Sequence, residues 1–525
     1  MIEDISLRVT PKTAATVSLL KKELAMAKGV TEKDINDLRI VRRSIDARQK
    51  MVKVNITVRV ATGDDSVVTP LLNPVRYERV AADAQSIIIV GAGPAGLFAA
   101  LKAIELGMRP IVVERGHDVD TRRVELAKIS KDGKVDPESN YCFGEGGAGA
   151  YSDGKLFTRS KKRGNVSEIL QILHQHGASA DILIDAHPHI GSDKLPGIIK
   201  NIRSTIEKCG GEVRFGTKMT DIILTGDKAT GIILENGEKL CGPVVLATGH
   251  SARDVYRLLN ERNIKIEAKG LAMGVRLEHP QHLIDCLQYH SNEGRGKYLP
   301  AAEYNFVTQI NGRGVYSFCM CPGGVVVPAM SGPSQSVVNG MSASARASQW
   351  SNSGMVVELH PGDIPGFEEH GQLEMLALQE SLEDEFFKAS GNSINAPAQR
   401  MTDFIIGKLS DTLPRSSYPA GTHSARLDKL LPPEIAERLK EGFKAFNRRC
   451  KGFLSKEALM VGLESRTSSP VRIPRDNESL SHVTIENLYP AGEGAGYAGG
   501  IVSAAIDGQR CVEAYHNKQK LKTNG

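Results

Sequence analysis

Residues 86–116 read SIIIVGAGPAGLFAALKAIELGMRPIVVERG, which predicts a strand, a glycine-rich turn, a helix and a second strand. Ile87–Val90 is a short apolar run typical of a strand buried on both faces. In the turn, Gly91 allows a tight bend, Gly93 lets the backbone approach a pyrophosphate, and Gly96 lets the helix pack closely on the strand. The pattern predicts dinucleotide binding, because such a turn aims backbone N–H groups at phosphate oxygens.

The helix is predicted to begin near Pro94 and Ala95, where its dipole favours an anionic group. The second strand ends in Glu114 and Arg115, about twenty residues past the glycines, where a carboxylate accepts hydrogen bonds from a ribose hydroxyl. Because that carboxylate would repel a 2′-phosphate, the site favours FAD or NAD over NADP. The alternatives are a strand–helix–strand unit without a ligand and a membrane span, although the glycines and Pro94 interrupt a run shorter than about 20 residues.

The composition describes an ordinary globular enzyme. The chain has 525 residues, enough for two or three domains, and its net charge of +5 does not by itself indicate a nucleic-acid partner. Its eight cysteines have no framework spacing, as expected for reduced thiols, and no second cysteine pair completes a zinc site. The first residues, MIEDISLRV, lack the features of a signal peptide. We therefore expect a cytoplasmic protein with no metal site and no membrane contact.

Three units are predicted along the chain. Residues 1–80 form a small α+β domain, with strands around Ile5–Val9 and Val52–Val60, a helix from Pro11 to about Gly29, and a linker over 62–85. The α/β fold class rests on a doubly wound, Rossmann-like nucleotide-binding domain, into which an α+β central domain is inserted as a substrate or cap domain. The nucleotide-binding domain is assigned to residues 84–262 and 456–525, and the central domain to residues 263–455.

Three further segments distinguish FAD from NAD. FGEGGAGAYSDGKL, residues 143–156, offers many backbone N–H groups to a phosphate or an isoalloxazine, unless it is a mobile surface loop. Ala247, Thr248 and Gly249 follow a buried strand over 244–246. LYPAGEGAGYAGGIVSAAIDG, residues 488–508, ends a strand and opens a helix of small residues. That helix N-terminus would stabilise negative charge on a reduced flavin, unless it is only a tightly packed helix start.

The motifs in this order resemble the FAD-dependent oxidoreductases called NAD(FAD)-utilizing dehydrogenases, in the glutathione-reductase-like flavoprotein superfamily. The resemblance spans nearly everything after residue 80. It extends through HPHIG (187–191), GVRLEHP (274–280), SFCMCPGG (317–324), VNGMS (338–342) and ESRTSSPVR (464–472). It implies a non-covalent FAD enzyme with an added central domain and a small N-terminal domain, and it brings no established substrate.

Carried over by motif, the resemblance assigns the pyrophosphate to Gly91, Gly93 and Gly96 and the adenosine ribose to Glu114. Gly492 and Glu493 stand where the superfamily has Gly-Asp with the aspartate on the ribityl chain, and this glutamate is one methylene longer. Val213, at a strand start, is a candidate backbone partner of adenine. The predicted FAD-binding residues are Gly91, Gly93, Pro94, Ala95, Gly96, Glu114, Arg115, Gly144, Gly146, Gly147, Gly149, Val213, Ala247, Thr248, Gly249, Gly492, Glu493, Gly499, Gly500 and Ile501.

Four side chains are the predicted catalytic residues. Arg466 suits bidentate capture of a substrate carboxylate or of the flavin pyrimidine, with a plain salt bridge as the alternative. Cys319 and Cys321 have CxC spacing and are redox or nucleophilic candidates, with buried packing thiols as the alternative. His189 is a candidate acid, base or hydrogen-bonding group. His187 and Glu464 are weaker candidates of the same kind.

The leading functional hypothesis is an FAD-dependent oxidoreductase that transfers a hydride at flavin N5 to or from a small molecule. A second strand–GxGxxG–helix unit is missing from the sequence, so NADH or NADPH would bind transiently, or the organic substrate itself would reduce the flavin. One alternative is a flavin-dependent RNA-modifying enzyme, motivated by basic residues that are more simply a solvated face. They are Arg42, Arg43, Arg48 and Lys50. The other alternative is a non-catalytic flavin-binding protein.

Overall fold

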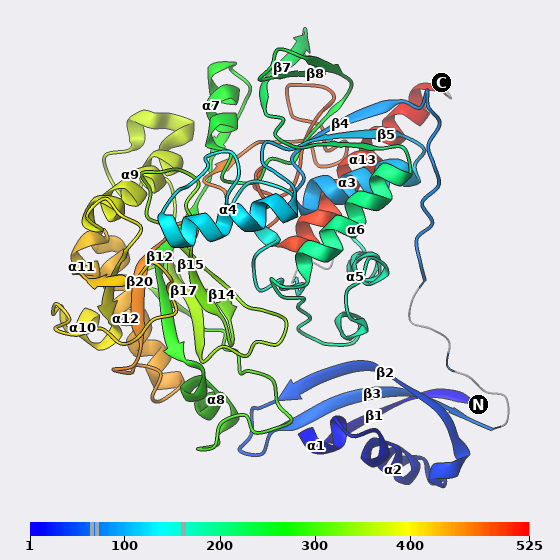
Figure 1. Cartoon of the computed structure of the whole chain (residues 1–525), viewed down its shortest axis with the longest axis vertical. Helices are drawn as coiled ribbons and strands as arrows, with labels where there is room; N and C mark the ends of the chain where they lie inside the picture. The colour runs from blue at the N-terminus through cyan, green and yellow to red at the C-terminus, as the bar shows by residue number, and fades with distance from the viewer. Residues whose placement is uncertain (64–67, 69–72, 159–163, 524–525) are drawn as a thin grey trace.

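The computed structural model describes residues 1–63, 68, 73–158 and 164–523 of the chain. A small N-terminal unit, a parallel sheet with its helices and a larger seven-stranded sheet follow one another along the chain (Figure 1). The predicted linker over 62–85 lies partly outside the described residues.

The N-terminal unit is an antiparallel sheet in the order β1-β3-β2 with a helix against one face. The apolar residues that alternate along β3, among them Ile56 and Val58, pack against Leu20 and Leu24 of α2. The opposite face of β3 carries polar side chains, so the alternation predicted from the sequence is observed. The elements are β1 (Ile2–Val9), α1 (Pro11–Ala14), α2 (Val17–Lys28), β2 (Ile35–Asp46) and β3 (Lys53–Thr62).

Two features of this unit differ from the sequence prediction. The single helix expected from Pro11 is broken into α1 and α2 at Ala15 and Thr16, although Gly29 ends it in a left-handed conformation with φ of 70°. The basic stretch around Arg42 belongs to a strand, β2, that the sequence analysis did not predict. Its pairing with β3 shifts register twice, so its apolar residues do not alternate regularly.

The parallel sheet has the order β22-β10-β4-β5-β6, and every neighbouring pair is parallel. Ile87 and Ile89 of β4 pack into the core on one face, and Ile88 and Val90 pack into the core on the other. The predicted strand is therefore buried on both faces. Because β22 comes from the far end of the chain, the sheet joins strands from both sides of the central segment.

Helices α3, α6 and α13 cover one face of this sheet, whereas the antiparallel β7-β8-β9 meander and α7 cover the other (Figure 1). The sheet is Rossmann-like, but the meander occupies most of one face, so helices do not wind both faces as a doubly wound fold would have them. The elements are β4 (Ser86–Val90), α3 (Pro94–Glu105), β5 (Arg109–Val113), α4 (Val119–Asp132), α5 (Val166–Gln175), α6 (Leu195–Lys208), β6 (Glu212–Arg214), β7 (Met219–Thr225), β8 (Lys228–Leu234), β9 (Lys239–Cys241), β10 (Val244–Leu246), α7 (Arg253–Glu261), β22 (Leu488–Pro490) and α13 (Ile501–Thr523).

The larger sheet has the order β13-β14-β17-β12-β20-β18-β19 and packs on α9 and α12 through one apolar core. Across the described ranges, none of the helices is long and apolar enough to cross a membrane. The elements are β11 (Glu267–Ala268), β12 (Leu271–Pro280), α8 (Gln281–Tyr289), β13 (Val307–Ile310), β14 (Arg313–Cys321), β15 (Val325–Pro328), β16 (Val338–Met341), β17 (Trp350–Leu359), α9 (Glu374–Ala389), β18 (Ala396–Arg400), α10 (Met401–Ile406), β19 (Thr422–Ser424), α11 (Leu427–Leu430), α12 (Pro433–Arg449), β20 (Leu459–Glu464) and β21 (Val471–Arg472).

Candidate functional site

A cavity of about 380 Å³ lies where the loops that follow β4, β5 and β10 meet one end of β14 and β16. Open α/β sheets bind their ligands at the carboxyl ends of the strands, which is where these loops begin. We name its two ends by their lining residues. The nucleotide end is lined by Glu114, Arg115, Thr217 and Met219, and the sheet end by Lys155, Phe318, Cys319 and Asn339.

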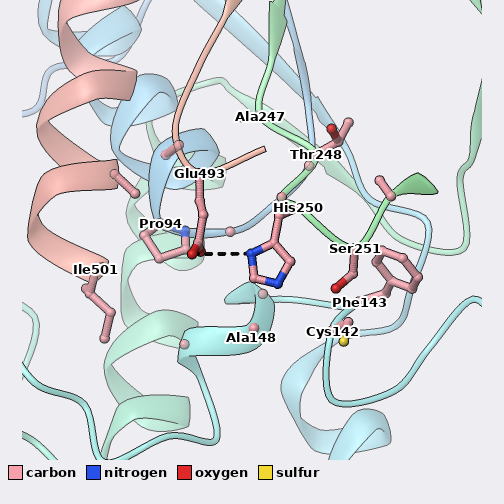
Figure 2. A pocket seen from close by; sticks show the side chains of 18 of the residues that line it. Pro94, Cys142, Phe143, Ala148, Ala247, Thr248, His250, Ser251, Glu493 and Ile501 are labelled. Carbon is pink, nitrogen blue, oxygen red and sulfur yellow. Dashed lines mark ion pairs between the residues drawn. The ribbon is translucent and has the colours of Figure 1, made fainter. Parts of the chain in front are cut away.

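Most of the predicted FAD-binding residues line this cavity, although they come from four distant parts of the sequence. Figure 2 shows how Pro94, Ala247 and Ile501 approach one another there. The predicted residues in the lining are Gly91, Gly93, Pro94, Ala95, Glu114, Arg115, Gly147, Gly149, Ala247, Thr248, Gly249, Glu493, Gly499, Gly500 and Ile501, with Arg466 and Cys319 from the catalytic set.

The other predicted residues lie outside the lining and support it or stand apart from it. They are Gly96, Gly144, Gly146, Val213, Gly492, His189 and Cys321. Gly492 donates its N–H to Asp507 at 2.8 Å. His189 Nε2 donates to the Ser344 carbonyl oxygen at 3.2 Å, and His189 does not line the cavity.

The glycine turn has the shape that a pyrophosphate requires. Gly91 has φ of 105°, and a Cβ there would lie 2.4 Å from the Ala247 carbonyl oxygen. A Cβ on Gly96 would lie 1.9 Å from the Gly91 carbonyl oxygen, so α3 can start this close to β4 only with glycine. Gly93 precedes α3 and carries no side chain to cap its first N–H groups. These donors therefore remain available to an anionic ligand.

Glu114 fixes three backbone segments around the nucleotide end. Its Oε2 accepts from the Ala92 N–H at 2.8 Å, and its Oε1 accepts from Gly116 and Gly144 at 2.9 Å each. The side chain is buried, yet it still lines the cavity. A carboxylate has about four acceptor positions, so three of them hold the protein together and one remains for a ribose hydroxyl.

The centre of the cavity holds a pair that the sequence analysis missed. His250 Nδ1 lies 3.2 Å from Glu493 Oε1, between Pro94 and Ala148 (Figure 2). The residue follows directly after Ala247–Gly249, and the motif could have been extended by one position. The pair places an imidazole ring and a carboxylate where a ribityl chain is predicted. Glu493 therefore contacts His250 in addition to the ribityl chain that it is predicted to bind.

Arg466 is buried in a network that uses its donors. Its Nε and Nη2 donate to the two Glu383 oxygens at 3.2 and 3.1 Å, and Arg253 donates to the same carboxylate at 2.7 Å. Although burial raises the pKa of Glu383, Arg253 and Arg466 lower it to about 2. The remaining Arg466 donors reach Ser251, Ser331, Cys142 and Gln335. The geometry favours a salt bridge that shapes the cavity wall, while capture of a substrate carboxylate stays a prediction.

The sheet end contains a second set of buried charges. Arg276 on β12 donates to Glu464 on β20 at 3.1 Å and to the Cys319 carbonyl oxygen at 2.6 Å. Burial raises the pKa of Glu464 to about 7, and Arg276 opposes that rise. Lys155 donates to Asp153 at 2.9 Å and to the Met320 carbonyl. The His187 ring hydrogen-bonds Glu303 and is not part of the lining.

The fold and the cavity define a flavin-nucleotide-binding protein, and comparisons with known families agree. The profile described as an FAD binding domain matches residues 86–123, and the one described as FAD-dependent protein, C-terminal domain-like, matches residues 270–467. Residues 1–61 match a domain of unknown function (DUF8436). FAD is therefore the cofactor of this protein, as the sequence predicted.

An uncharacterized protein of Clostridium beijerinckii is 41% identical over 517 residues, which cover 95% of both chains. The chain belongs to the family of that protein. Among solved structures, CtdE in complex with FAD matches with 10% identity and a TM-score of 0.33, covering 82% of this chain and 84% of that one. A geranylgeranyl bacteriochlorophyll reductase-like protein of Thermoplasma acidophilum matches with 12% identity and a TM-score of 0.33, covering 83% and 80%. Likenesses this distant carry no functional argument.

Proposed function

We propose that the protein is an FAD-dependent oxidoreductase that transfers a hydride between a small molecule and flavin N5. We also assign it to the NAD(FAD)-utilizing dehydrogenases of the glutathione-reductase-like superfamily. The observation that supports this is one cavity, in which the glycine turn and Glu114 share a lining with Lys155, Cys319 and Asn339. A concave, mostly apolar site with a few convergent polar groups is where cofactors and substrates bind.

When bound, FAD supplies the acceptor or donor of the hydride. Residues of the chain would hold the anionic and the reactive parts of the bound FAD in place. The N-terminus of α3 faces the pyrophosphate position, and the N-terminus of α13 at Ile501 adds a second positive dipole end. A Cβ on Gly149 would lie 3.2 Å from Ile501, so the loop that carries Gly149 closes directly over the start of α13.

The remaining predictions accompany this function. We propose a small-molecule substrate, with NADH or NADPH as a transient electron donor, and a cytoplasmic location. We keep the predicted division into residues 1–80, residues 84–262 with 456–525, and residues 263–455, except that β20 (Leu459–Glu464) pairs with β12 and β18 and so belongs with the central segment.

The structure gives the RNA-modifying alternative little support. Arg43 is held by Asp185 at 2.7 Å and by Asp181 at 3.2 Å, and Arg48 is held by Asp46 at 2.8 Å. Two of the four basic residues thus have acidic partners, and their charge is offset locally. A small-molecule oxidoreductase remains the favoured function.

The test is anaerobic mixing of the FAD-loaded protein with NADH and then NADPH, while the flavin absorption band is followed. Rapid bleaching by either nucleotide is the expected result, with free FAD and the same nucleotide as the control. A band that persists with both nucleotides moves the search to organic reductants. A flavin that no metabolite reduces would establish the non-catalytic alternative.

A further inference from the structure

Cys319 and Cys321 lie at an irregularity of β14 next to the cavity. Phe318 pairs with Gly354 and Cys321 pairs with Asn352, and the register shifts between them. Cys319 has φ of 45°, a left-handed conformation that is costly for a residue with a side chain. Such conformations persist where the surroundings enforce them, and they gather at functional sites.

The irregularity turns the two thiols toward one another. Cys319 lines the cavity, whereas Cys321 is buried behind it with Sγ 3.4 Å from the Cys319 carbonyl oxygen. Residues two apart on an extended strand have Cα atoms about 6.6 Å apart, from a rise of about 3.3 Å each. A disulfide requires about 4.4–6.8 Å, so residues at this spacing lie within the upper part of that range. The pair can therefore close a disulfide with little backbone movement.

A buried guanidinium is fixed beside both sulfur-bearing residues. Arg276 Nη2 lies 3.3 Å from Cys321 Sγ and donates to the Cys319 carbonyl oxygen at 2.6 Å. Its approach requires Gly340 on β16, where a Cβ would lie 2.2 Å from the same nitrogen. Glu464 accepts from its Nη1 at 3.1 Å. Burying an ion pair adds little to stability, so the position of this guanidinium beside the thiols calls for another role.

The charges around Cys319 favour its thiolate. A hydrogen bond with Cys321, followed by the positive charges of Arg276 and Lys155, lowers the pKa of Cys319 against the effect of burial and of Asp153. The same hydrogen bond and burial raise the pKa of Cys321. One thiol is thus prepared to react while its neighbour keeps its proton.

The loop that carries Gly149, Ser152 and Lys155 links Cys319 and Cys321 to the start of α13. Lys155 donates to the carbonyl of Met320, the residue between the two cysteines. In the same loop, Ser152 donates to the Gly149 carbonyl at 2.8 Å, and Gly149 contacts Ile501 at the start of α13. This is the helix end that the sequence analysis assigned to the flavin pyrimidine.

We propose that Cys319 and Cys321 are a redox-active dithiol that exchanges two electrons with FAD. In the oxidising direction both S–H bonds break and one S–S bond forms, and the two electrons and two protons convert FAD to FADH2. In the reverse direction FADH2 reduces the disulfide. Cys319 is the thiol that faces the cofactor, and Cys321 is the thiol that closes the disulfide. This inference rests on the proposed function only in that FAD must be reducible in this cavity.

The first test reads the thiols themselves. Trypsin releases residues 314–346 as one peptide, in which Cys319 and Cys321 are the only cysteines. Reduced protein is mixed anaerobically with FAD, alkylated, digested and weighed. We expect the peptide to appear two hydrogens lighter and without alkyl groups, whereas protein without FAD gives the doubly alkylated peptide. Doubly alkylated peptide in both samples, or a disulfide that joins Cys319 to Cys142, would overturn the proposal.

The second test counts electrons. Dithionite titration of the oxidised, FAD-loaded protein should consume twice as many electron equivalents per FAD as Cys319→Ser or Cys321→Ser, because the disulfide adds a two-electron couple. Cys241→Ser, at an exposed thiol, is the matched control and should behave as wild type. Equal consumption in all four proteins would overturn the proposal. If a serine variant does not fold, the wild-type peptide mass decides alone. Flavin that dithionite reduces but nucleotides and metabolites do not would instead refute the proposed function.

Discussion

At the nucleotide end of the cavity, the Glu114 carboxylate accepts hydrogen bonds from three backbone N–H groups. At the sheet end, the Glu464 carboxylate meets the guanidinium of Arg276 on another strand, and that guanidinium also serves Cys319 and Cys321. Backbone amides are neutral donors in fixed positions, whereas the sheet end contains ionisable groups that compete for one positive charge.

The comparison indicates that the nucleotide end is suited to bind a cofactor in a fixed position, whereas the sheet end contains the groups suited to react. Three amide donors hold the Glu114 carboxylate in its place. Burial and the neighbouring Cys319 raise the pKa of Glu464, and the charge of Arg276 opposes that rise. Groups whose protonation can change near neutral pH are the ones that proton-coupled chemistry uses.

The largest effect is expected from Gly96→Ala at the nucleotide end. The added Cβ would lie 1.9 Å from the Gly91 carbonyl oxygen, and a backbone atom cannot move aside as a side chain can. The cost should exceed the about 1–3 kcal/mol of ordinary overpacking, and the protein should retain no FAD after purification. Gly197→Ala is the matched control, because Gly197 is also the third residue of a helix and has no atom within 4 Å of the added Cβ. Normal FAD content in Gly96→Ala would contradict the assigned role of the turn.

Glu383→Gln tests the buried network that Glu383 forms with Arg253 and Arg466 in the cavity wall. It leaves Arg253 and Arg466 buried without their common carboxylate, so the free energy of unfolding should fall by about 3–5 kcal/mol. Urea unfolding measures this, with Asp384→Asn on the same helix as the control, since the exposed Asp384–Lys388 pair contributes little to stability. Equal losses in the two variants would show that burial does not set the energy of the Glu383 network.

The pH dependence of stability sharpens the comparison at the sheet end. The pKa of Glu464 is about 7 in the folded protein and 4.5 in the reference state, so the folded protein holds the extra proton between these values. The free energy of unfolding therefore falls as pH rises from 4.5 to 7, by about 3 kcal/mol at most.

Glu464→Gln should remove that decline, and Glu457→Gln, at an exposed position on the same segment, should keep it. The single tryptophan of the chain, Trp350, lies at the start of β17, so its fluorescence follows unfolding of the same sheet. An unchanged pH profile in Glu464→Gln would mean that another group carries the dependence.

The smallest effect is expected outside both ends, at the contact between the N-terminal unit and the rest of the chain. Arg43→Ala removes a half-exposed pair with Asp185, while the backbone hydrogen bonds from Arg43 to Ile184 and from Ala186 to Arg43 remain. The melting temperature should change little, because such a pair contributes about 0–1 kcal/mol. Arg42→Ala provides the comparison, and a large loss in Arg43→Ala alone would show that the side chain fixes the unit in place.

The nucleotide end could be predicted almost completely from the sequence. The strand over Ile87–Val90, the helix from Pro94 and the acid at Glu114 follow one another within thirty residues, and the structure shows each of them. Most of the residues predicted in the three glycine-rich segments line the cavity, and their contacts with FAD stay a prediction. Local steric rules decide such features, and the residues that these rules involve are close together in the sequence.

The sheet end could be predicted only as a set of candidates. Cys319 and Cys321 were identified by type and spacing, but Arg276 was not, because it reaches them from a strand more than forty residues away. Arg466 was expected to bind a ligand, and its partner Glu383 is 83 residues distant. The strand β2 was missed because two register shifts interrupt its apolar alternation. The His250–Glu493 pair was missed because its two members lie far apart in the sequence.

By itself, the sequence determined that this protein binds a dinucleotide through a βαβ turn and that FAD or NAD is favoured over NADP there, because backbone geometry at glycine and the charge of Glu114 act over short distances. Three further glycine-rich segments then favoured FAD over NAD. Only the tertiary structure decided which ionisable side chains share a buried site. Burial and the distance between charges set their energies, and neither is known until the strands of the large sheet have paired.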